Sequence, residues 1–253
     1  MLELTLSTAT PAGNIQMKAP ISKVLIDAIM TFNDTTFPDA ADAFISQFST
    51  ATVEVIRNGE MGGARTLINT VPIADIAEIA ARNEGYVKIT KLTSGVAATA
   101  RVQFSVELNN FGSIDANNSN FVRLNLTGFI NTNTKFYSKS SPFVNDNFIK
   151  YESLGCQAAS ETVFDVAGKY AIAVPKTLSV IEITYPTGNT ERIYPEELDL
   201  CSADLTEIVF LVDGRVTSFK NWFVYDVSQA VQVKVTLNTS GIIYLLSNNS
   251  FED

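Results

Sequence analysis

Histidine is absent from this chain of 253 residues. Because histidine is the commonest general base and a frequent metal ligand, its absence excludes the usual Ser–His and Cys–His catalytic arrangements and most zinc and iron sites. The glycine cluster from Gly59 to Gly63 lacks the lysine of a phosphate-binding loop and is predicted to form a turn. Carboxylates remain, and two of them could meet in space to hydrolyse a glycan. We assign no catalytic and no cofactor-binding residue and predict that the chain is not an enzyme, with glycan cleavage as an alternative left open.

Cysteines, basic residues and long apolar runs are scarce as well. Cys156 and Cys201 form no CxxC pair and are expected to be reduced thiols of a chain made in a cytoplasm.

Eighteen Lys and Arg oppose 27 Asp and Glu, for a net charge of −9. We therefore expect no direct binding to nucleic acid, and adhesion to an anionic membrane would need a local basic face or divalent cations. No apolar stretch approaches the length of a membrane span, and Asp27 already interrupts the run Val24–Met30. Met1–Thr5 lacks the parts of a secretory signal.

What the sequence does contain is a series of short runs in which every second residue is apolar. Clear examples are Arg101–Leu108, Phe121–Thr127 and Ala230–Leu237. This alternation is typical of a strand with one face toward a core and the other toward water. Turn-forming pairs such as Asn58-Gly59 and Asp213-Gly214 separate the runs. The pattern predicts an all-β chain of the antiparallel sandwich or barrel type.

Two segments have helical rather than strand periodicity. Pro72–Asn83 places apolar residues three and four apart, with Thr70 as a predicted cap and Asp75 and Glu78 on the polar side. Pro38–Gln47 is a second, weaker candidate. The chain is therefore predicted to carry a short helix within its first half.

The same design is present twice in the chain. Gly13 and Gly168 begin one matched pair of segments, and Gly59 and Gly214 end another; both pairs are 155 residues apart (168 − 13 and 214 − 59). A third pair, beginning at Val102 and Val231, is 129 residues apart (231 − 102). Matches in one order at fixed offsets indicate a tandem duplication. We therefore predict two domains, 1–135 and 136–253, with the polar stretch from Asn131 to Gly155 as the junction. The matched pairs are Gly13–Pro20 with Gly168–Pro175, Val53–Gly59 with Ile208–Gly214, and Val102–Gly112 with Val231–Gly241.

Two groups of acidic residues lie close together in the sequence and could supply oxygen ligands to calcium. Neither has the spacing of an EF-hand, and acids solvated in loops are the preferred explanation of both groups. The metal ligands are therefore left unassigned. The groups are Asp34, Asp39 and Asp42, and Glu196, Glu197 and Asp199.

An aromatic group near the C-terminus has two interpretations. Trp222, with Phe219, Phe223 and Tyr225, could form an exposed patch on which sugars stack. Aromatic residues in a β-rich segment are otherwise part of a core. Exposure of the Trp222 side chain distinguishes the two.

The opening segment Leu4–Pro20, with the strand Lys23–Thr31 that follows it, resembles the start of the major capsid proteins of corticovirus-like bacteriophages. These are icosahedral phages with a membrane beneath the shell. The resemblance spans the chain as a pattern of elements and agrees with the duplication and the length. Further segments that carry it are Val53–Gly59, Ile208–Gly214, Val231–Leu237 and Ile242–Leu246.

The resemblance implies a double jelly-roll, in which two tandem eight-stranded sandwiches form one chain. Such chains form homotrimers whose six barrels make a pseudo-hexameric tile of the shell. The resemblance also implies contacts with neighbouring capsomers, with vertex proteins and with the viral membrane below, and a location in the capsid of the virion. Some relatives bind calcium, but no residue here matches a ligand motif of the family.

Other functions stay open at this point. A minor vertex or spike protein of the same shell is one alternative, and a carbohydrate-binding β-sandwich protein, stable as a monomer, is another. For a self-associating protein we expect strands with apolar residues on both faces, since large obligate interfaces resemble a core cut in half. Val24–Met30 and Ile242–Leu246 are the candidates, although an ordinary buried strand would explain them equally.

Overall fold

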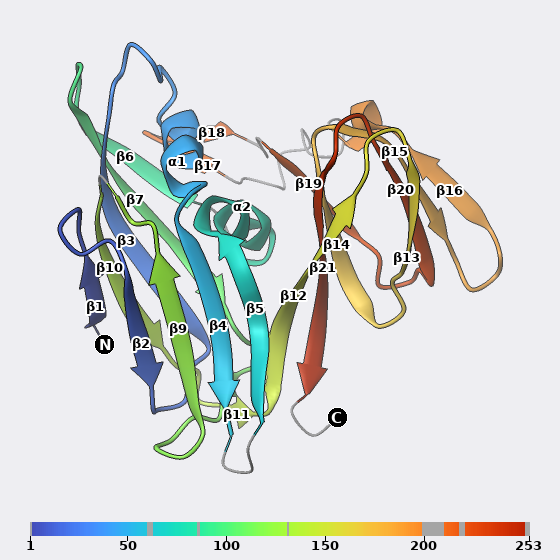
Figure 1. The fold of residues 1–253 in the computed structure, drawn as a ribbon, viewed down its shortest axis with the longest axis horizontal. Helices are drawn as coiled ribbons and strands as arrows, with labels where there is room; N and C mark the ends of the chain where they lie inside the picture. The colour runs from blue at the N-terminus through green and yellow to red at the C-terminus, as the bar shows by residue number, and fades with distance from the viewer. Residues whose placement is uncertain are drawn as a thin grey trace. The chain divides into compact units, whose positions relative to one another are not determined.

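The computed structural model describes residues 2–59, 63–84, 87–130, 132–198, 210–217 and 221–250. Strands make up 60% and helices 10% of it, which confirms the prediction of an all-β protein (Figure 1). Unit 1 comprises Met1–Ile149, Ile208–Thr217 and Asn249–Asp253, and unit 2 comprises Lys150–Glu207 and Ser218–Asn248. The predicted domain boundary between 135 and 136 lies inside strand β10 (Thr132–Lys139), all of which belongs to unit 1.

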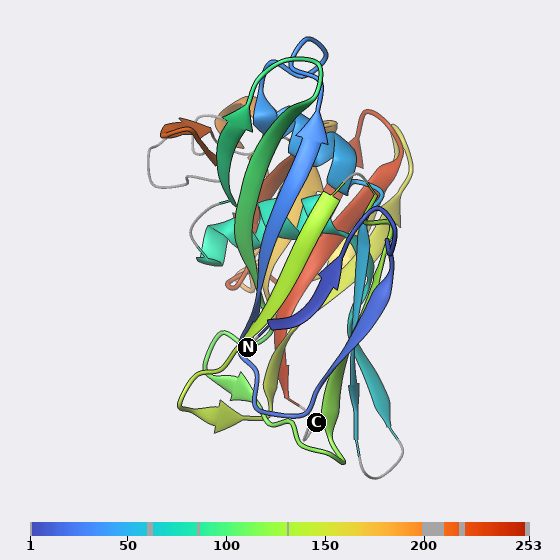
Figure 2. The same ribbon diagram turned by 90° about the vertical axis from the view of Figure 1, so that its left-hand side faces the viewer.

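Unit 1 contains two sheets and a short strand pair. Neighbouring strands are antiparallel except β6 with β17 and β8 with β11. Figure 2 shows the first sheet in front, with β10, β3, β7 and β6 side by side. The first sheet has the order β1 (Leu2–Leu6), β10, β3 (Lys23–Phe32), β7 (Ala98–Glu107), β6 (Val87–Thr93), β17 (Phe210–Val212) and β18 (Arg215–Thr217). The second contains, in order, β5 (Ala64–Pro72), β4 (Thr52–Asn58), β9 (Phe121–Thr127) and β2 (Gly13–Met17), and the pair is β8 (Ser113–Ile114) with β11 (Val144–Asn145).

The core of unit 1 follows from the alternation of its strands. On β3 the buried residues are every second one, with Val24 and Ile26 inward and Leu25 outward. A void of about 10 Å³ is lined by Val24 and Ile26 of the first sheet and by Val53 and Leu124 of the second. The two sheets therefore face each other across this core, each with its other face outward.

Helix α1 (Ala40–Phe48) confirms the weaker helix prediction. Asp39 caps it, because the Asp39 Oδ1 atom accepts a hydrogen bond of 2.9 Å from the backbone N–H of Ala41. Phe44 of this helix is fully buried, and its ring lies 5.7 Å from that of Phe104 on β7 and 6.2 Å from that of Phe210 on β17. Packing of Phe44 against Phe210 thus connects β17 with α1 in the core of unit 1.

Helix α2 (Ile73–Glu84) confirms the stronger helix prediction, but two of its details were wrong. Thr70 does not cap the helix: it lies in β5 with a φ of +48°. The backbone N–H of Ile73 is satisfied instead by the carbonyl of Ala51, at 2.7 Å. Glu78, predicted on the polar side, is only 1% exposed. The reason is that α2 contacts α1, β5, β6 and β7, so its polar side is enclosed as well.

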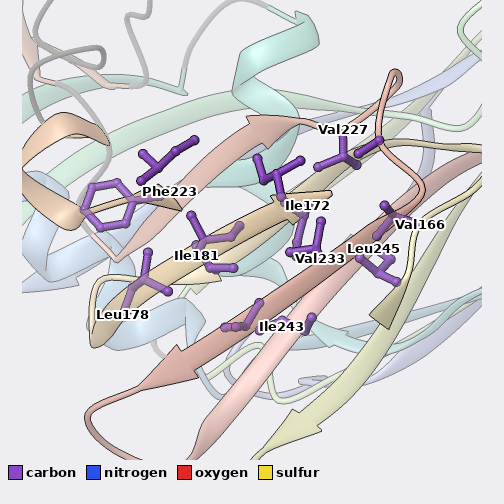
Figure 3. Packing of buried hydrophobic residues seen from close by; sticks show 14 of the residues in the cluster. Val166, Ile172, Leu178, Ile181, Phe223, Val227, Val233, Ile243 and Leu245 are labelled. Carbon is purple, nitrogen blue, oxygen red and sulfur yellow. The ribbon is translucent and has the colours of Figure 1, made fainter. Parts of the chain in front are cut away.

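Unit 2 is a smaller two-sheet structure. Its core contains Ile172 and Ile243 from one sheet and Ile181 and Val233 from the other (Figure 3). The chain enters unit 2 within β12 (Asn147–Cys156) and leaves it within β21 (Gly241–Ser250). One sheet has the order β13 (Glu161–Asp165), β20 (Gln232–Leu237), β15 (Leu178–Thr184) and β16 (Thr190–Ile193), and the other contains β19 (Trp222–Asp226), β14 (Lys169–Pro175) and β21.

The two units share a pairing pattern that matches most of the predicted repeat. In unit 1 the consecutive strands β2 and β3 lie in opposite sheets and pair with β9 and β7. In unit 2 the consecutive strands β14 and β15 also lie in opposite sheets, and β14 pairs with β21 while β15 pairs with β20. The segments predicted to correspond, β2 with β14 and β7 with β20, therefore hold equivalent positions.

One predicted correspondence is wrong. Val53–Gly59 forms β4, which pairs antiparallel with β9 and β5. The matched segment Ile208–Gly214 contains β17, which pairs parallel with β6 in unit 1, while Ile208 and Val209 lie outside the described residues. The reason for the mismatch is that this part of the chain joins the sheet of unit 1 rather than a sheet of unit 2.

Candidate interaction surface

The outer face of the first sheet of unit 1 is the most distinctive described surface. Alternation turns Leu25 and Asp27 of β3 outward, together with Arg101 of β7, Tyr137 of β10 and Lys88 of β6. These side chains line a hollow of about 500 Å³, to which Gln103, Ser105 and Lys139 also contribute. Four neighbouring strands of the first sheet (Figure 2) thus place polar, charged and aromatic groups around one hollow.

An ion pair with two hydrogen bonds lies across the middle of this hollow. The Nε and Nη2 atoms of Arg101 each donate to a carboxylate oxygen of Asp27 at 2.8 Å. The hydrogen bonds from Arg101 hold the pKa of Asp27 below its usual range, against the opposing effect of desolvation, and Lys135 adds to the lowering. Asp27 is therefore ionised at neutral pH and fixes the guanidinium in place.

Positive charge exceeds negative charge on this face. Lys88, Lys135 and Lys139 have no acidic group within 4 Å among the residues that the structure describes. At the outward positions of β3, β6, β7 and β10, five positive side chains oppose two negative ones, which leaves a local surplus of +3 (5 − 2) on a chain whose net charge is −9. The seven are Lys23, Lys88, Arg101, Lys135 and Lys139, and Asp27 and Glu107.

The same face also exposes apolar side chains. A second hollow of about 720 Å³ is lined by Ile29, Thr31, Val96 and Asn133, among others. Ile29 is 43% exposed and Val96 77% exposed. Exposed apolar side chains within a polar and charged surround are one mark of a surface that contacts another molecule.

The predicted acidic group Asp34, Asp39 and Asp42 is engaged in other contacts. Asp34 forms an ion pair of 2.7 Å with Lys91 Nζ and accepts a hydrogen bond from the Gly95 N–H at 2.8 Å, and these contacts lower the pKa of Asp34. Asp39 caps α1, and Asp42 lies in the first turn of that helix. The structure does not bring the three together as a metal site.

The second predicted acidic group is only partly described. Glu197 accepts a hydrogen bond of 2.8 Å from the Tyr194 N–H, Glu196 is exposed, and Asp199 lies outside the described residues. Within the described ranges, no three Asp, Glu, Cys or His side chains are grouped to hold a metal ion. Calcium binding stays untested, as a property that only the family resemblance implies.

The core interpretation of the aromatic group is confirmed. Trp222 is 6% exposed and packs on Tyr244 at a ring distance of 5.0 Å. Phe223 belongs to the core of unit 2, and Tyr225 is packed against that core (Figure 3). Phe219 lies outside the described residues. The alternative interpretation, a sugar-stacking patch around Trp222, is therefore contradicted. Trp222 and Phe223 are adjacent in β19 and point to opposite faces of the strand, yet both side chains are buried.

Burial makes the Cys156 thiol, the one cysteine among the described residues, unreactive. Cys156 is a free, buried thiol, and Cys201 lies outside the described residues. Burial raises the pKa of the Cys156 thiol, with a hydrogen bond to Thr162 acting in the opposite direction. A buried thiol of raised pKa is a poor nucleophile.

Sequence reasoning named the strand Val24–Met30 of this surface as a candidate for self-association, but it assigned no role to the charged residues around it. The available signals were that Asp27 interrupts an apolar run and that Arg101 occupies an outward position of an alternating strand. Neither shows that the two meet, because they are 74 residues apart and come together only when β3 pairs with β7.

No protein-family model matches the chain, and a search of curated proteins finds no match. In the described part of the chain, no helix is long and apolar enough to cross a membrane.

Proposed function

We propose that this chain is a self-associating structural protein, the major capsid protein of an icosahedral, membrane-containing bacteriophage, built as a double jelly-roll. The observation that carries the proposal is the strand pairing shared by the two units. In each unit the first strand of the motif pairs with the last, and the second pairs with an earlier strand of the opposite sheet: β2 with β9 and β3 with β7, β14 with β21 and β15 with β20. A long antiparallel hairpin wound into a two-sheet sandwich has this pairing, and such a winding is the jelly-roll.

The duplication has a physical use in a shell. A trimer of a chain with two similar units contains six similar blocks, so an object with three-fold symmetry presents nearly six-fold edges. One kind of tile then covers a large surface through contacts with neighbouring capsomers, with vertex proteins at the corners and the viral membrane beneath.

Apolar groups at outward positions support self-association. On β3, part of the predicted run Val24–Met30, Leu25 and Ile29 stand on the side away from the core. On β21, which includes Ile242–Leu246, Ile242 is 49% exposed. Side chains of this kind at a surface are stabilised when a second copy covers them.

Negative-stain electron microscopy of the purified chain over a concentration series tests the proposal. We expect three-fold particles of near-hexagonal outline at low concentration, and flat arrays or shell fragments at high concentration. Five-fold rings would contradict it by indicating a vertex protein. Single 27.5 kDa particles at every concentration would contradict self-association altogether, and a glycan array would then be the next experiment.

A further inference from the structure

We propose that the basic outer face of unit 1 is one half of the contact between copies of this chain, and that it receives the acidic edge of unit 2 of a second copy. The basic face is defined by Lys88, Arg101, Lys135 and Lys139. The acidic edge is defined by Glu191, Glu196 and Glu197, at and after β16. This inference rests on the proposed function, since it names the surfaces through which the copies associate.

The argument begins with the overall charge. Two copies that each carry −9 repel each other on average, so a stable contact needs a region where opposite charges meet. The basic face, with its surplus of three positive charges, provides such a region. Asp27 and Arg101 lie at its centre and neutralise each other, so the unpaired charge is that of Lys88, Lys135 and Lys139.

The acidic edge is complementary in sign. Glu191 and Glu196 are exposed, and Arg192 between them is neutralised by Glu182, whose Oε2 atom lies 2.6 Å from the Arg192 Nε atom. The hydroxyl of Tyr185 donates to Glu191 at 2.7 Å and so holds this carboxylate in position without removing its charge. The edge therefore presents fixed negative charges.

An aromatic side chain lies within the same edge. Tyr194 follows β16 directly and is 48% exposed, although its backbone N–H is fixed by Glu197. The hollow of about 500 Å³ is large enough to take a tyrosine ring beside Leu25 and Tyr137, with the Asp27–Arg101 pair as its polar part. Exposed tyrosines held by rigid backbone are common anchors of protein interfaces.

The geometry of such a contact agrees with a closed assembly. The basic face and the acidic edge are different surfaces of one chain, so the contact is heterologous and each copy uses both halves. Repetition of one heterologous contact gives a ring when the rotation closes, and a trimer is a ring of three such contacts.

Charge reversal and its rescue test this inference. The first variant is Lys88→Glu with Lys139→Glu, the second is Glu191→Lys with Glu196→Lys, and the third combines all four changes. Association is measured by light scattering coupled to size exclusion over a dilution series. We expect each double variant to weaken association at least tenfold, and the combined variant to restore it to within a few-fold of the unmodified chain.

A matched control changes the net charge by the same amount elsewhere in unit 1. Lys18→Glu with Arg65→Glu alters residues next to β2 and on β5, in the second sheet, and should leave association within about threefold of the original. Circular dichroism verifies folding, and Lys88→Gln with Lys139→Gln replaces the first double variant if that one does not fold.

The outcomes separate the inference from the proposed function. If the unmodified chain associates and the double variants associate equally well, or if the combined variant is no better than either double, this interface is wrong while self-association stands. If the unmodified chain is monomeric at every concentration, the proposed function itself fails.

Discussion

At Gly128 the backbone has a φ of +77°, a conformation in which side chains other than that of glycine are strained. A Cβ atom added there would lie 2.3 Å from the carbonyl oxygen of Thr50, so crowding adds to the strain. Gly168 has the same φ of +77°, but nothing lies within 4 Å of its added Cβ. Substitution of Gly168 therefore measures the cost of the left-handed backbone conformation alone, and substitution of Gly128 measures that cost together with the clash with Thr50.

We predict that Gly128→Ala lowers the free energy of unfolding by about 3 kcal/mol and Gly168→Ala by about 1 kcal/mol. Urea unfolding, followed separately for the transitions of each unit, measures both. Equal losses at the two positions would show that the contact with Thr50 relaxes at no cost.

Asp27 makes a pH-dependent contribution to stability. Because Arg101 lowers its pKa in the folded state, the contribution is present above the unfolded-state pKa of about 3.9 and is lost as the pH falls through the lower folded-state pKa. We predict that Asp27→Asn costs roughly 0.5–1 kcal/mol at pH 7 and progressively less as the pH falls through the lowered folded-state pKa of Asp27. Urea unfolding of both proteins from pH 7 to pH 2.5 tests this, and a difference that does not vary with pH would argue against the ion pair.

At the scale of single elements, α1 depends on its cap as well as on its buried phenylalanines. Asp39 accepts from the Ala41 N–H, so Asp39→Ala should cost about 1 kcal/mol, whereas Asp39→Asn, which keeps an acceptor oxygen, should cost a few tenths. Thermal unfolding of the two variants measures the difference. If Asn is as damaging as Ala, the charge of Asp39 matters more than its hydrogen bond, and a cation near Asp34 and Asp39 would have to be considered again.

The longer alternating strands and the helices α1 and α2 could be predicted because periodicity reports which face of a segment is buried. The helical residues 195–198, which include Glu196 and Glu197, were not predicted. The surroundings of α2 could not be predicted, and Glu78 shows why: its position on the helix looks polar, but other elements of unit 1 enclose it. The position of β17 in the first sheet could not be predicted from the sequence either, since β17 pairs with β6, more than 100 residues earlier in the chain. The basic face could not be predicted for the same reason, because the outward residues of its four strands meet only when strands far apart in the sequence pair.

At the scale of the whole molecule, the uneven distribution of charge and the repeated strand pairing lead to the same expectation. The repeated pairing supplies two similar units for one tile, and the basic face on an acidic chain supplies a place where copies attract. Electrostatic attraction of this kind is screened by salt, so we predict that association weakens between 50 mM and 500 mM NaCl, more steeply for the unmodified chain than for Lys88→Gln with Lys139→Gln. Light scattering at the two salt concentrations measures this, and equal salt dependence would point to an apolar contact elsewhere.

Self-association is the central claim, and the solution mass of the purified chain is the most direct test of it. Light scattering coupled to size exclusion should give three times the 27.5 kDa chain mass, and the value should persist on dilution. A stable mass of 27.5 kDa at every concentration would contradict the claim.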